Sequence, residues 1–336
     1  MSCTCLPSIE LAAGLRISQL GFGTAEIGNL YRRIGGPEAQ NALAAAWTSG
    51  ITLYDTAPGY GAGLSELRLG AFLRDRVGSV VVTKIGRSFR RARGQPNPTL
   101  FTAPLPFDGQ FDYSYDGVMR SFEHSTLRLG LAHIDMLLVH DLDRRNHGDQ
   151  LEHHYRILME SGLRALQELQ RSGDVKLIGI AVNEPEIGVR MLNDGKFDVA
   201  LLASRYTLIE QGAAHDFFPA AVARNVKILA GGVFNSGILA SGAEAGATYD
   251  YVEAGPEIIA KVRRLGRLCN EWNVSLPGAA MQFTAAHPAV AAILTATSRA
   301  ERVAPLVAQF TTPIPAGFWA ELRQSGLLDP AALLPA

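Results

Sequence analysis

The chain has 336 residues, of which 47% are hydrophobic and 19% are charged, and its formal net charge is −1. This length allows one large domain or two ordinary ones, and the apolar content suffices for a large core, which excludes disorder over most of the chain. The near-neutral charge argues against nucleic acid as the main partner, because phosphate binding needs a clustered basic surface.

The cysteines and the N-terminus indicate the cellular compartment of the protein. Cys3, Cys5 and Cys269 are too few, and odd in number, to form a disulfide framework. They fit a reducing compartment, so we expect a cytoplasmic protein. No apolar stretch near the N-terminus is long enough for a signal peptide, and no run of about 18 apolar residues predicts a membrane span.

Eight short runs rich in apolar and β-branched residues predict strands. Most are apolar almost throughout rather than alternating, which is typical of parallel strands covered on both faces. They cover residues 17–24, 51–56, 80–85, 135–141, 176–182, 199–205, 227–233 and 291–297.

Helical patterns fill the segments between these runs. They cover residues 37–50, 65–75, 115–129, 151–172, 184–194, 217–224, 256–273 and 299–309. Pro37 suits a first helical turn, and Ser65 is a predicted N-cap. Eight strands alternating with helices predict a single (β/α)8 barrel over residues 1–336. A doubly wound sheet is the alternative, but it needs fewer strands and usually a glycine-rich phosphate loop after the first of them.

Residues 87–114 interrupt this alternation. They contain four prolines and several arginines, without periodicity, so we expect a long loop. The segment follows the third predicted strand, which places it on the carboxyl-terminal face of a barrel, where active sites lie. Long loops are often functional, so this one is interpreted as a lid or a substrate wall, with a disordered excursion as the alternative.

Polar side chains end three consecutive predicted strands. Asp55, Lys84 and His140 hold these positions, and Tyr60 follows Asp55 in the next loop. Because the strand ends meet at one rim, the four side chains are expected to converge. Lys84 would lower the pKa of Tyr60, Asp55 would hold the lysine cation, and His140 would orient a substrate oxygen. Such a tyrosine can exchange a proton at a carbon–oxygen centre during hydride transfer with a nicotinamide.

Each of these residues also has a simpler interpretation. Asp55 alone is compatible with a turn, His140 with a structural role and Tyr60 with packing. Lys84 alone would suit a Schiff-base aldolase. The occurrence of all four at neighbouring strand ends favours the joint interpretation.

Several motifs together resemble the aldo-keto reductases, a superfamily of (β/α)8 barrels that bind NAD(P)(H). The matching segments are residues 21–28 (GFGTAEIG), 55–61 (DTAPGYG), 65–70 (SELRLG), 82–84 (VTK), 135–141 (DMLLVHD) and 178–184 (IGIAVNE). The resemblance covers about residues 15–330. It implies that Asp55, Tyr60, Lys84 and His140 form a catalytic tetrad in which Tyr60 is the general acid/base.

Three further segments resemble one branch of this superfamily, the D-threo-aldose 1-dehydrogenases (L-fucose, D-arabinose and L-galactose dehydrogenases) and the pyridoxal 4-dehydrogenases. They are residues 112–121, 201–211 and 231–239. The resemblance implies oxidation of a cyclic hemiacetal to a lactone, with either an aldose or pyridoxal as the small-molecule substrate. Aromatic residues of the 87–114 segment are candidates to stack on a pyridoxal ring: Phe101, Phe107, Phe111 and Tyr113.

Two other functions within the superfamily stay open. One is a general reductase of aldehydes, and the other is a binding module like the β-subunits of potassium channels. The complete tetrad argues against the second. The sequence does not indicate an oligomeric state.

The resemblance also implies cofactor contacts on loops that follow several strands. The candidates are Gly23, Thr24, Asn183, Ser204, Gly232, Phe234, Asn235, Gly237, Leu239, Thr295, Thr297 and Arg302. Backbone amides of residues 231–239 would cradle the pyrophosphate. Many family members stack an aromatic residue on the nicotinamide where this chain has Gly231, so Phe234 is the candidate for that role.

The cofactor preference depends on a substitution after the eighth strand. Ala296 stands where NADPH-preferring members usually have a lysine or arginine that pairs with the 2′-phosphate. We therefore expect NAD to be preferred, although Arg299 and Arg302 leave NADP possible.

Overall fold

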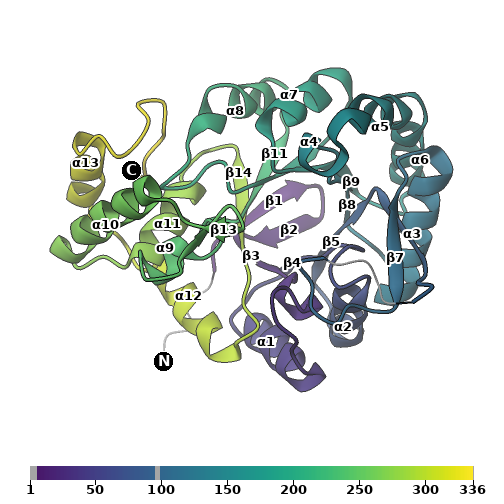
Figure 1. The fold of residues 1–336 in the computed structure, drawn as a ribbon, viewed down its shortest axis with the longest axis horizontal. Coiled ribbons are helices and arrows are strands. Elements are labelled where there is room, and N and C mark those ends of the chain that lie inside the picture. Colours follow the sequence, from purple (N-terminus) through teal and green to yellow (C-terminus); the bar gives the residue numbers. More distant parts are fainter. Residues whose placement is uncertain (1–5, 95–98, 336) are drawn as a thin grey trace.

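The eight apolar runs form a closed barrel of parallel strands in the computed structural model, which describes residues 6–94 and 99–335 (Figure 1). The strands in barrel order are β3 (Leu20–Gly23), β4 (Leu53–Asp55), β5 (Val80–Ile85), β8 (Met136–His140), β9 (Leu177–Val182), β10 (Val199–Ala203), β11 (Lys227–Gly231) and β14 (Val290–Thr295). β14 pairs with β3 and closes the barrel. The predicted (β/α)8 fold is confirmed.

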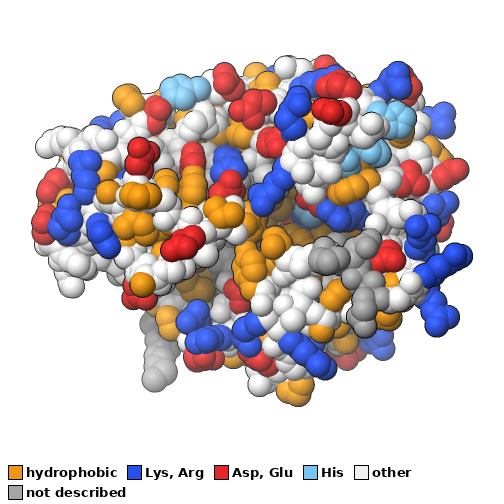
Figure 2. Space-filling model, in the orientation of Figure 1, with side chains coloured by type: hydrophobic (Ala, Val, Ile, Leu, Met, Phe, Trp, Pro, Cys, Tyr) orange, Lys and Arg blue, Asp and Glu red, His pale blue; other side chains and the backbone are white. Residues whose placement is uncertain are grey.

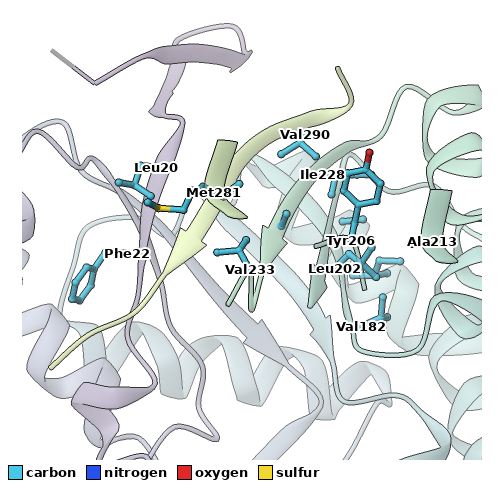
Figure 3. Close-up of a cluster of buried hydrophobic side chains, with 14 of the residues drawn as sticks. Leu20, Phe22, Val182, Leu202, Tyr206, Ala213, Ile228, Val233, Met281 and Val290 are labelled. Atoms are coloured by element: carbon cyan, nitrogen blue, oxygen red, sulfur yellow. The ribbon is translucent and has the colours of Figure 1, made fainter. Parts of the chain in front are cut away.

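Alternate residues of each strand contribute to two apolar layers. In β8, for example, Met136 and Leu138 pack inside the barrel, whereas Leu137 packs in the layer between strands and helices. Figure 3 shows part of this outer layer, which includes Leu20, Tyr206 and Met281. Burial on both faces is the reason why these strands are apolar nearly throughout.

Helices surround the barrel on all sides (Figure 1). They are α1 (Gly36–Thr48), α2 (Leu64–Leu73), α3 (Tyr115–Leu129), α5 (Leu151–Ile157), α6 (Leu163–Ser172), α7 (Pro185–Asp194), α8 (Phe217–Ala223), α10 (Pro256–Glu271), α11 (Leu276–Ala285), α12 (Val303–Thr311) and α13 (Ala316–Gln324). A π-helical turn, Leu158–Gly162, joins α5 to α6. The short helices α4 (Arg144–His147) and α9 (Ile238–Ser241) follow β8 and β11.

Two elements differ from the sequence-based expectation at the beginning of the chain. The predicted strand 17–24 is divided into β2 (Leu15–Ser18) and β3, and β2 pairs with β1 (Ser8–Ala12) in an antiparallel hairpin. Leu15 and Ile17 pack with the interior residues of the barrel, so the hairpin covers its amino-terminal end.

The 87–114 segment also differs from the expected loop. Its ends form an antiparallel hairpin, in which β6 (Arg87–Arg91) pairs with β7 (Phe107–Phe111). The expectation of a structureless loop was therefore wrong for these ends. The segment does project from the end of β5, on the expected face.

A glycine fixes the contact between α2 and α3. A Cβ atom on Gly70 would overlap the backbone carbonyl group of Leu129. We expect Gly70→Ala to destabilise the protein by about 1–3 kcal/mol, because the two helices would have to separate. Thermal unfolding would measure the effect.

Gly266 in α10 provides a matched control, because a Cβ there would meet no atom within 4 Å. Gly266→Ala should raise the unfolding temperature slightly, since alanine favours the helix by about 0.5–1 kcal/mol. Equal effects of the two substitutions would contradict the packing role of Gly70.

Candidate active site

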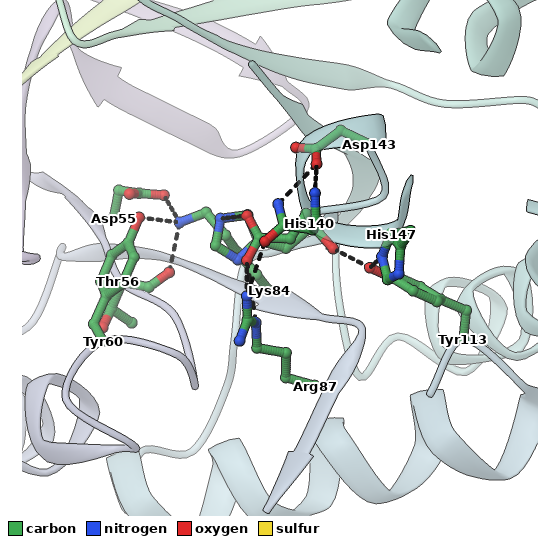
Figure 4. Close-up of polar contacts among 11 residues, drawn as sticks. Asp55, Thr56, Tyr60, Lys84, Arg87, Tyr113, His140, Asp143 and His147 are labelled. Carbon is green, nitrogen blue, oxygen red and sulfur yellow. Dashed lines mark hydrogen bonds and ion pairs between the residues drawn. The ribbon is translucent and has the colours of Figure 1, made fainter. Parts of the chain in front are cut away.

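The four polar residues at the strand ends lie together at the carboxyl-terminal rim of the barrel (Figure 4). The ammonium group of Lys84 donates hydrogen bonds to Asp55 Oδ1 and to the carbonyl group of Thr56, both at 2.7 Å. It also lies 3.4 Å from the hydroxyl oxygen of Tyr60. The rings of Tyr60 and His140 meet edge to face, with centroids 6.1 Å apart. The expected convergence is therefore present.

The four side chains differ in their access to solvent. Asp55 and Lys84 are 4% and 1% exposed, so their ion pair lies beneath the surface of the site. Tyr60 and His140 are partly exposed. Figure 2 shows that this face of the molecule is hollowed near its centre. A substrate entering there would meet the phenol and the imidazole before the buried ion pair.

The pKa values of Tyr60 and His140 are shifted because both side chains are largely covered by the protein. Burial raises the pKa of Tyr60 well above its ordinary value, and the carboxylates of Asp55 and Asp141 add to this effect. The lowering of this pKa that the sequence led us to expect is therefore not found. Burial also lowers the pKa of His140 to about 4. At neutral pH the site therefore presents a neutral phenol and a neutral imidazole, each of which can donate one hydrogen bond.

A buried hydroxyl network anchors the loop that carries Tyr60. The Ser65 hydroxyl donates to Thr24, and the hydroxyl and amide groups of Thr24 both donate to the carbonyl group of Asp55. Ser65 is therefore not the N-cap of α2, as the sequence suggested. Gly63 holds that position with a φ of +100°, which glycine adopts without strain.

An additional charged pair, not predicted from the sequence, adjoins the four residues. Asp141 Oδ2 accepts hydrogen bonds from Arg87 Nε at 3.1 Å and Nη2 at 2.8 Å, while Asp141 Oδ1 lies 3.3 Å from His140 Nε2. Burial acts to raise the pKa of Asp141, but His140 and Arg87 outweigh it and hold the pKa below its ordinary value. A signal was present, since Asp141 directly follows His140 in the family-like motif.

The 87–114 segment forms one wall of the site. The ring of Phe101 stacks on that of Tyr60, with centroids 5.7 Å apart and planes at 28°. Backbone hydrogen bonds fix the neighbouring residues: the Tyr31 amide donates to Leu100, and the Leu105 amide donates to Gly61. This supports the substrate-wall interpretation for the described part of the segment.

The other three aromatic candidates lie away from Tyr60. Tyr113 is fully buried, and its hydroxyl donates to the carbonyl group of His140. Phe111 stacks on Tyr113, and Phe107 is exposed on β7. Of the four candidates, Phe101 is the one placed to contact a substrate.

The candidate cofactor residues lie on neighbouring strand ends around the barrel. Asn183 follows β9, Ser204 follows β10, residues 232–239 follow β11, Thr295 and Thr297 end or follow β14, and Gly23 and Thr24 end or follow β3. These five strands are adjacent in the barrel, and β4, β5 and β8 complete it. The candidate cofactor loops thus form one continuous arc beside the Tyr60 site.

Packing within this arc covers several of the candidate residues. Gly232 has a φ of +61°, and a Cβ there would overlap the Ser204 hydroxyl. Asn235 is buried and donates to the carbonyl group of Ser204, so it braces the loop. Thr24 and Leu239 are also fully buried. Thr24, Asn235 and Leu239 therefore present almost no surface to a cofactor, through either the side chain or the backbone.

The loop after β11 has free backbone donors. Within the part of the chain that the structure describes, the amides of Phe234 and Ser236 donate no hydrogen bond. Gly237 has a φ of +102° and open space on its Cβ side. Unpaired amides in a glycine-containing turn fit a pyrophosphate group. Phe234 is partly buried against the core, and Arg302 is exposed.

The described residues hold neither a metal-binding cluster nor a membrane-spanning helix. Residues 6–94 and 99–335 contain no cluster of His, Cys, Asp and Glu that would hold a metal ion. In the same residues, no helix has the length and apolar character needed to cross a membrane. Cys269 is a buried free thiol, whereas Cys3 and Cys5 lie outside the described residues.

Comparison with known proteins gives consistent matches over nearly the whole chain. Residues 19–326 match the model of the aldo/keto reductase family. The chain is 42% identical to pyridoxal 4-dehydrogenase of Microbacterium luteolum over 94% of this chain and 96% of the relative. It is 37% identical to D-threo-aldose 1-dehydrogenase of a Pseudomonas species, with the same coverage of both chains. A holo aldo-keto reductase of Bacillus halodurans superposes with a TM-score of 0.76 at 20% identity, covering 98% of each chain.

Proposed function

Because this chain belongs to the aldo/keto reductase family, we propose that it is a dehydrogenase that oxidises a cyclic hemiacetal to a lactone. Its nicotinamide cofactor, when bound, would accept the hydride from the hemiacetal carbon. The candidate cofactor arc lies directly beside Tyr60, and the free amides of the loop after β11 fit the pyrophosphate. The single buried free thiol that is described, Cys269, is compatible with the cytoplasmic location expected from the sequence.

The observation that carries the proposal is that the Tyr60 hydroxyl lies 3.4 Å from the Lys84 ammonium, on a ring that meets the His140 ring edge to face. During oxidation, Tyr60 would act as a phenolate that removes the hydroxyl proton, and Lys84 would stabilise that anion. Neutral His140 would donate a hydrogen bond to the same substrate oxygen and orient it. In the reverse direction, the neutral phenol would return the proton.

The Schiff-base alternative is less compatible with this geometry. The Lys84 ammonium is held by Asp55 and the carbonyl group of Thr56 at 2.7 Å each. An amine nucleophile must lose its proton, and a neighbouring carboxylate opposes that loss. Borohydride trapping of Lys84 with an aldehyde would support the aldolase alternative.

The substrate is proposed to be either an aldose such as L-fucose or D-arabinose, oxidised at C1, or pyridoxal. Identity to the two dehydrogenases supports both, and the Phe101 ring beside Tyr60 favours an aromatic substrate. The test is an assay at the NADH absorption band with L-fucose, D-arabinose, L-galactose, D-galactose and pyridoxal, each with NAD and with NADP. Reduction of simple aldehydes without oxidation of any hemiacetal would favour a general reductase instead.

NAD is the proposed cofactor because Ala296 places no cation where NADPH-preferring family members usually have one. Glu26 accepts hydrogen bonds from the amide and hydroxyl groups of Ser298, and Glu38 pairs with Arg32. Arg32, Glu38, Ser298 and Arg299 line a cavity of about 500 Å³ next to this loop. Glu26 and Glu38 are thus engaged by Ser298 and Arg32, and Arg299 in the same cavity leaves NADP possible.

Ala296→Lys should shift the preference toward NADP by about 10- to 100-fold in kcat/KM. Ala296 is exposed, so a lysine can extend to the 2′-phosphate, and charge-assisted hydrogen bonds contribute about 1.5–3 kcal/mol. Steady-state kinetics with both cofactors would measure the shift.

Ala296→Met is the matched control, because it adds length without charge and should leave the cofactor ratio close to that of the unmodified protein. A tenfold or greater preference of the unmodified protein for NADP would contradict the assignment. Such a result would indicate that Arg299 or Arg302 already holds the phosphate.

A further inference from the structure

The carboxylate of Asp141 is an accessible acceptor in the floor of the site. Its side chain is 16% exposed, close to the 14% of His140, whereas Asp55 and Lys84 are covered. Oδ2 is taken by Arg87 Nε and Nη2. Among the described residues, the one polar contact of Oδ1 is with His140 Nε2 at 3.3 Å. Oδ1 therefore has fewer partners than Oδ2, and a carboxylate oxygen with one partner can accept a further hydrogen bond from a donor that enters the site.

The position of Oδ1 indicates which donor it would bind. It lies 3.3 Å from Nε2 of His140, the residue proposed to hold the reacting oxygen. Adjacent oxygens of a polyhydroxy compound are also separated by about one hydrogen-bond length. When one oxygen contacts Nε2, the neighbouring hydroxyl therefore comes within reach of Oδ1. An ionised carboxylate can only accept hydrogen bonds. It therefore favours a substrate with a hydroxyl group at this position over one with a hydrogen atom or an ether oxygen there.

We propose that Asp141 is a specificity-determining residue, whose Oδ1 accepts a hydrogen bond from a hydroxyl group beside the reacting carbon of the substrate. The inference rests on the proposed function and deepens it. In an aldose this group is the C2 hydroxyl. In pyridoxal it is the ring hydroxyl on the carbon next to the one that bears the reacting carbon. Both substrate classes share this chemistry.

Arg87 is the positioning residue for this carboxylate. It is the first residue of the hairpin that begins the 87–114 segment, and its guanidinium stacks on the ring of Phe111, 4.2 Å from the centroid. Nη2 also lies 3.4 Å from Asn146 Oδ1, and the side-chain amide of Asn146 donates to Asp143. With Oδ2 fixed from this side, Oδ1 stays directed to His140. The hairpin thereby contributes to substrate selection without contacting the substrate through Arg87.

The backbone conformation of Asp141 also directs its side chain toward His140. Its φ of +57° lies in the left-handed region, which aspartate adopts more readily than most residues. The conformation allows two consecutive side chains, His140 and Asp141, to approach each other at the strand end, instead of pointing to opposite faces as in a continuing strand.

The experiment compares paired substrates in the unmodified protein, Asp141→Asn and Asp141→Ala. The pairs are an aldose with its 2-deoxy analogue, and pyridoxal with its 3-deoxy analogue, in the oxidative direction. Glyceraldehyde and 3-hydroxypropanal form a third pair, in the reductive direction. The readout is the ratio of kcat/KM within each pair. Hydrogen bonds to charged groups predict a ratio of about 10- to 100-fold in the unmodified protein, falling to within about threefold in Asp141→Ala.

Glu152→Gln is the matched control, because it removes a carboxylate paired with Arg190 on the exposed surface. It should leave every ratio unchanged. If Asp141 only stabilised the fold, its replacement would lower the rates with both members of a pair in parallel. A ratio that stays the same in Asp141→Ala would overturn the inference.

Failure of the proposed function gives a different pattern. In that case no hemiacetal is oxidised, but the reductive pair still reports whether Asp141 selects the neighbouring hydroxyl. A protein inactive in both directions would overturn both proposals. The aldose and pyridoxal pairs also show which of the two substrate classes supplies the hydroxyl group that Asp141 binds.

Discussion

Tyr60→Phe is expected to lower kcat by about 100- to 10,000-fold, the range that general acid–base groups contribute. The substitution removes the hydroxyl, which lies 3.4 Å from Lys84 Nζ, and retains the ring that stacks on Phe101. The affinity for NAD should stay within a few-fold, because the hydroxyl handles the proton and not the cofactor. Steady-state kinetics with the best substrate, together with calorimetric titration of NAD, would separate the two effects.

Tyr155→Phe provides the control for this substitution. The Tyr155 hydroxyl donates to Asp194 on the outer helices, away from the strand ends. Its loss should leave kcat close to that of the unmodified protein. If Tyr60→Phe retained more than about a tenth of kcat, Tyr60 would not be the general acid/base.

The barrel was predictable because its strands are buried on both faces. A run such as VVVTKI at residues 80–85 is apolar enough to identify without any knowledge of its partners. Because such runs alternate with predicted helices, only a few chain topologies are compatible with the sequence. The position of the rim residues follows, because parallel strands place all their carboxyl ends on one face.

The sequence did not predict the helices and strands whose burial depends on segments far away in the chain. In α11, the sequence LPGAAMQFTA is apolar around most of its circumference, so it has no amphipathic pattern; its burial against α12 and β14 explains this composition. The hairpin of β1 and β2 was also missed, because its apolar residues join the barrel interior rather than a face of their own. Within residues 87–114, proline and arginine obscured two five-residue strands.

In the candidate active site, too, contacts between residues distant in sequence could not be predicted. Asp55, Tyr60, Lys84 and His140 stood out because each occupies a strand end or the loop after it. The partner of Asp141 is Arg87, 54 positions earlier, and only the folded chain brings them together. The pKa of Tyr60 was expected to fall because a lysine cation lies nearby. Its burial, which acts in the opposite direction, could not be inferred from residue types.

Lys84→Met is expected to reduce kcat by a factor comparable to that of Tyr60→Phe and to move the pH profile of oxidation to higher pH. Oxidation needs the phenolate of Tyr60, so its rate rises with pH until the pKa of Tyr60 is passed. Removing a cation 3.4 Å from the hydroxyl raises that pKa further. The pH dependence of kcat would measure the displacement, which must be toward alkaline pH if Lys84 stabilises the phenolate.

The double variant Asp55→Asn/Lys84→Met distinguishes this electrostatic effect from damage to the fold. Lys84→Met alone leaves the buried carboxylate of Asp55 without its partner, which costs about 3–5 kcal/mol in comparable pairs. The double variant removes that carboxylate, which itself raises the pKa of Tyr60. It should therefore be more stable than Lys84→Met and show a smaller alkaline displacement. A pH profile unchanged in both variants would remove Lys84 from the mechanism and leave the ion pair with a structural role alone.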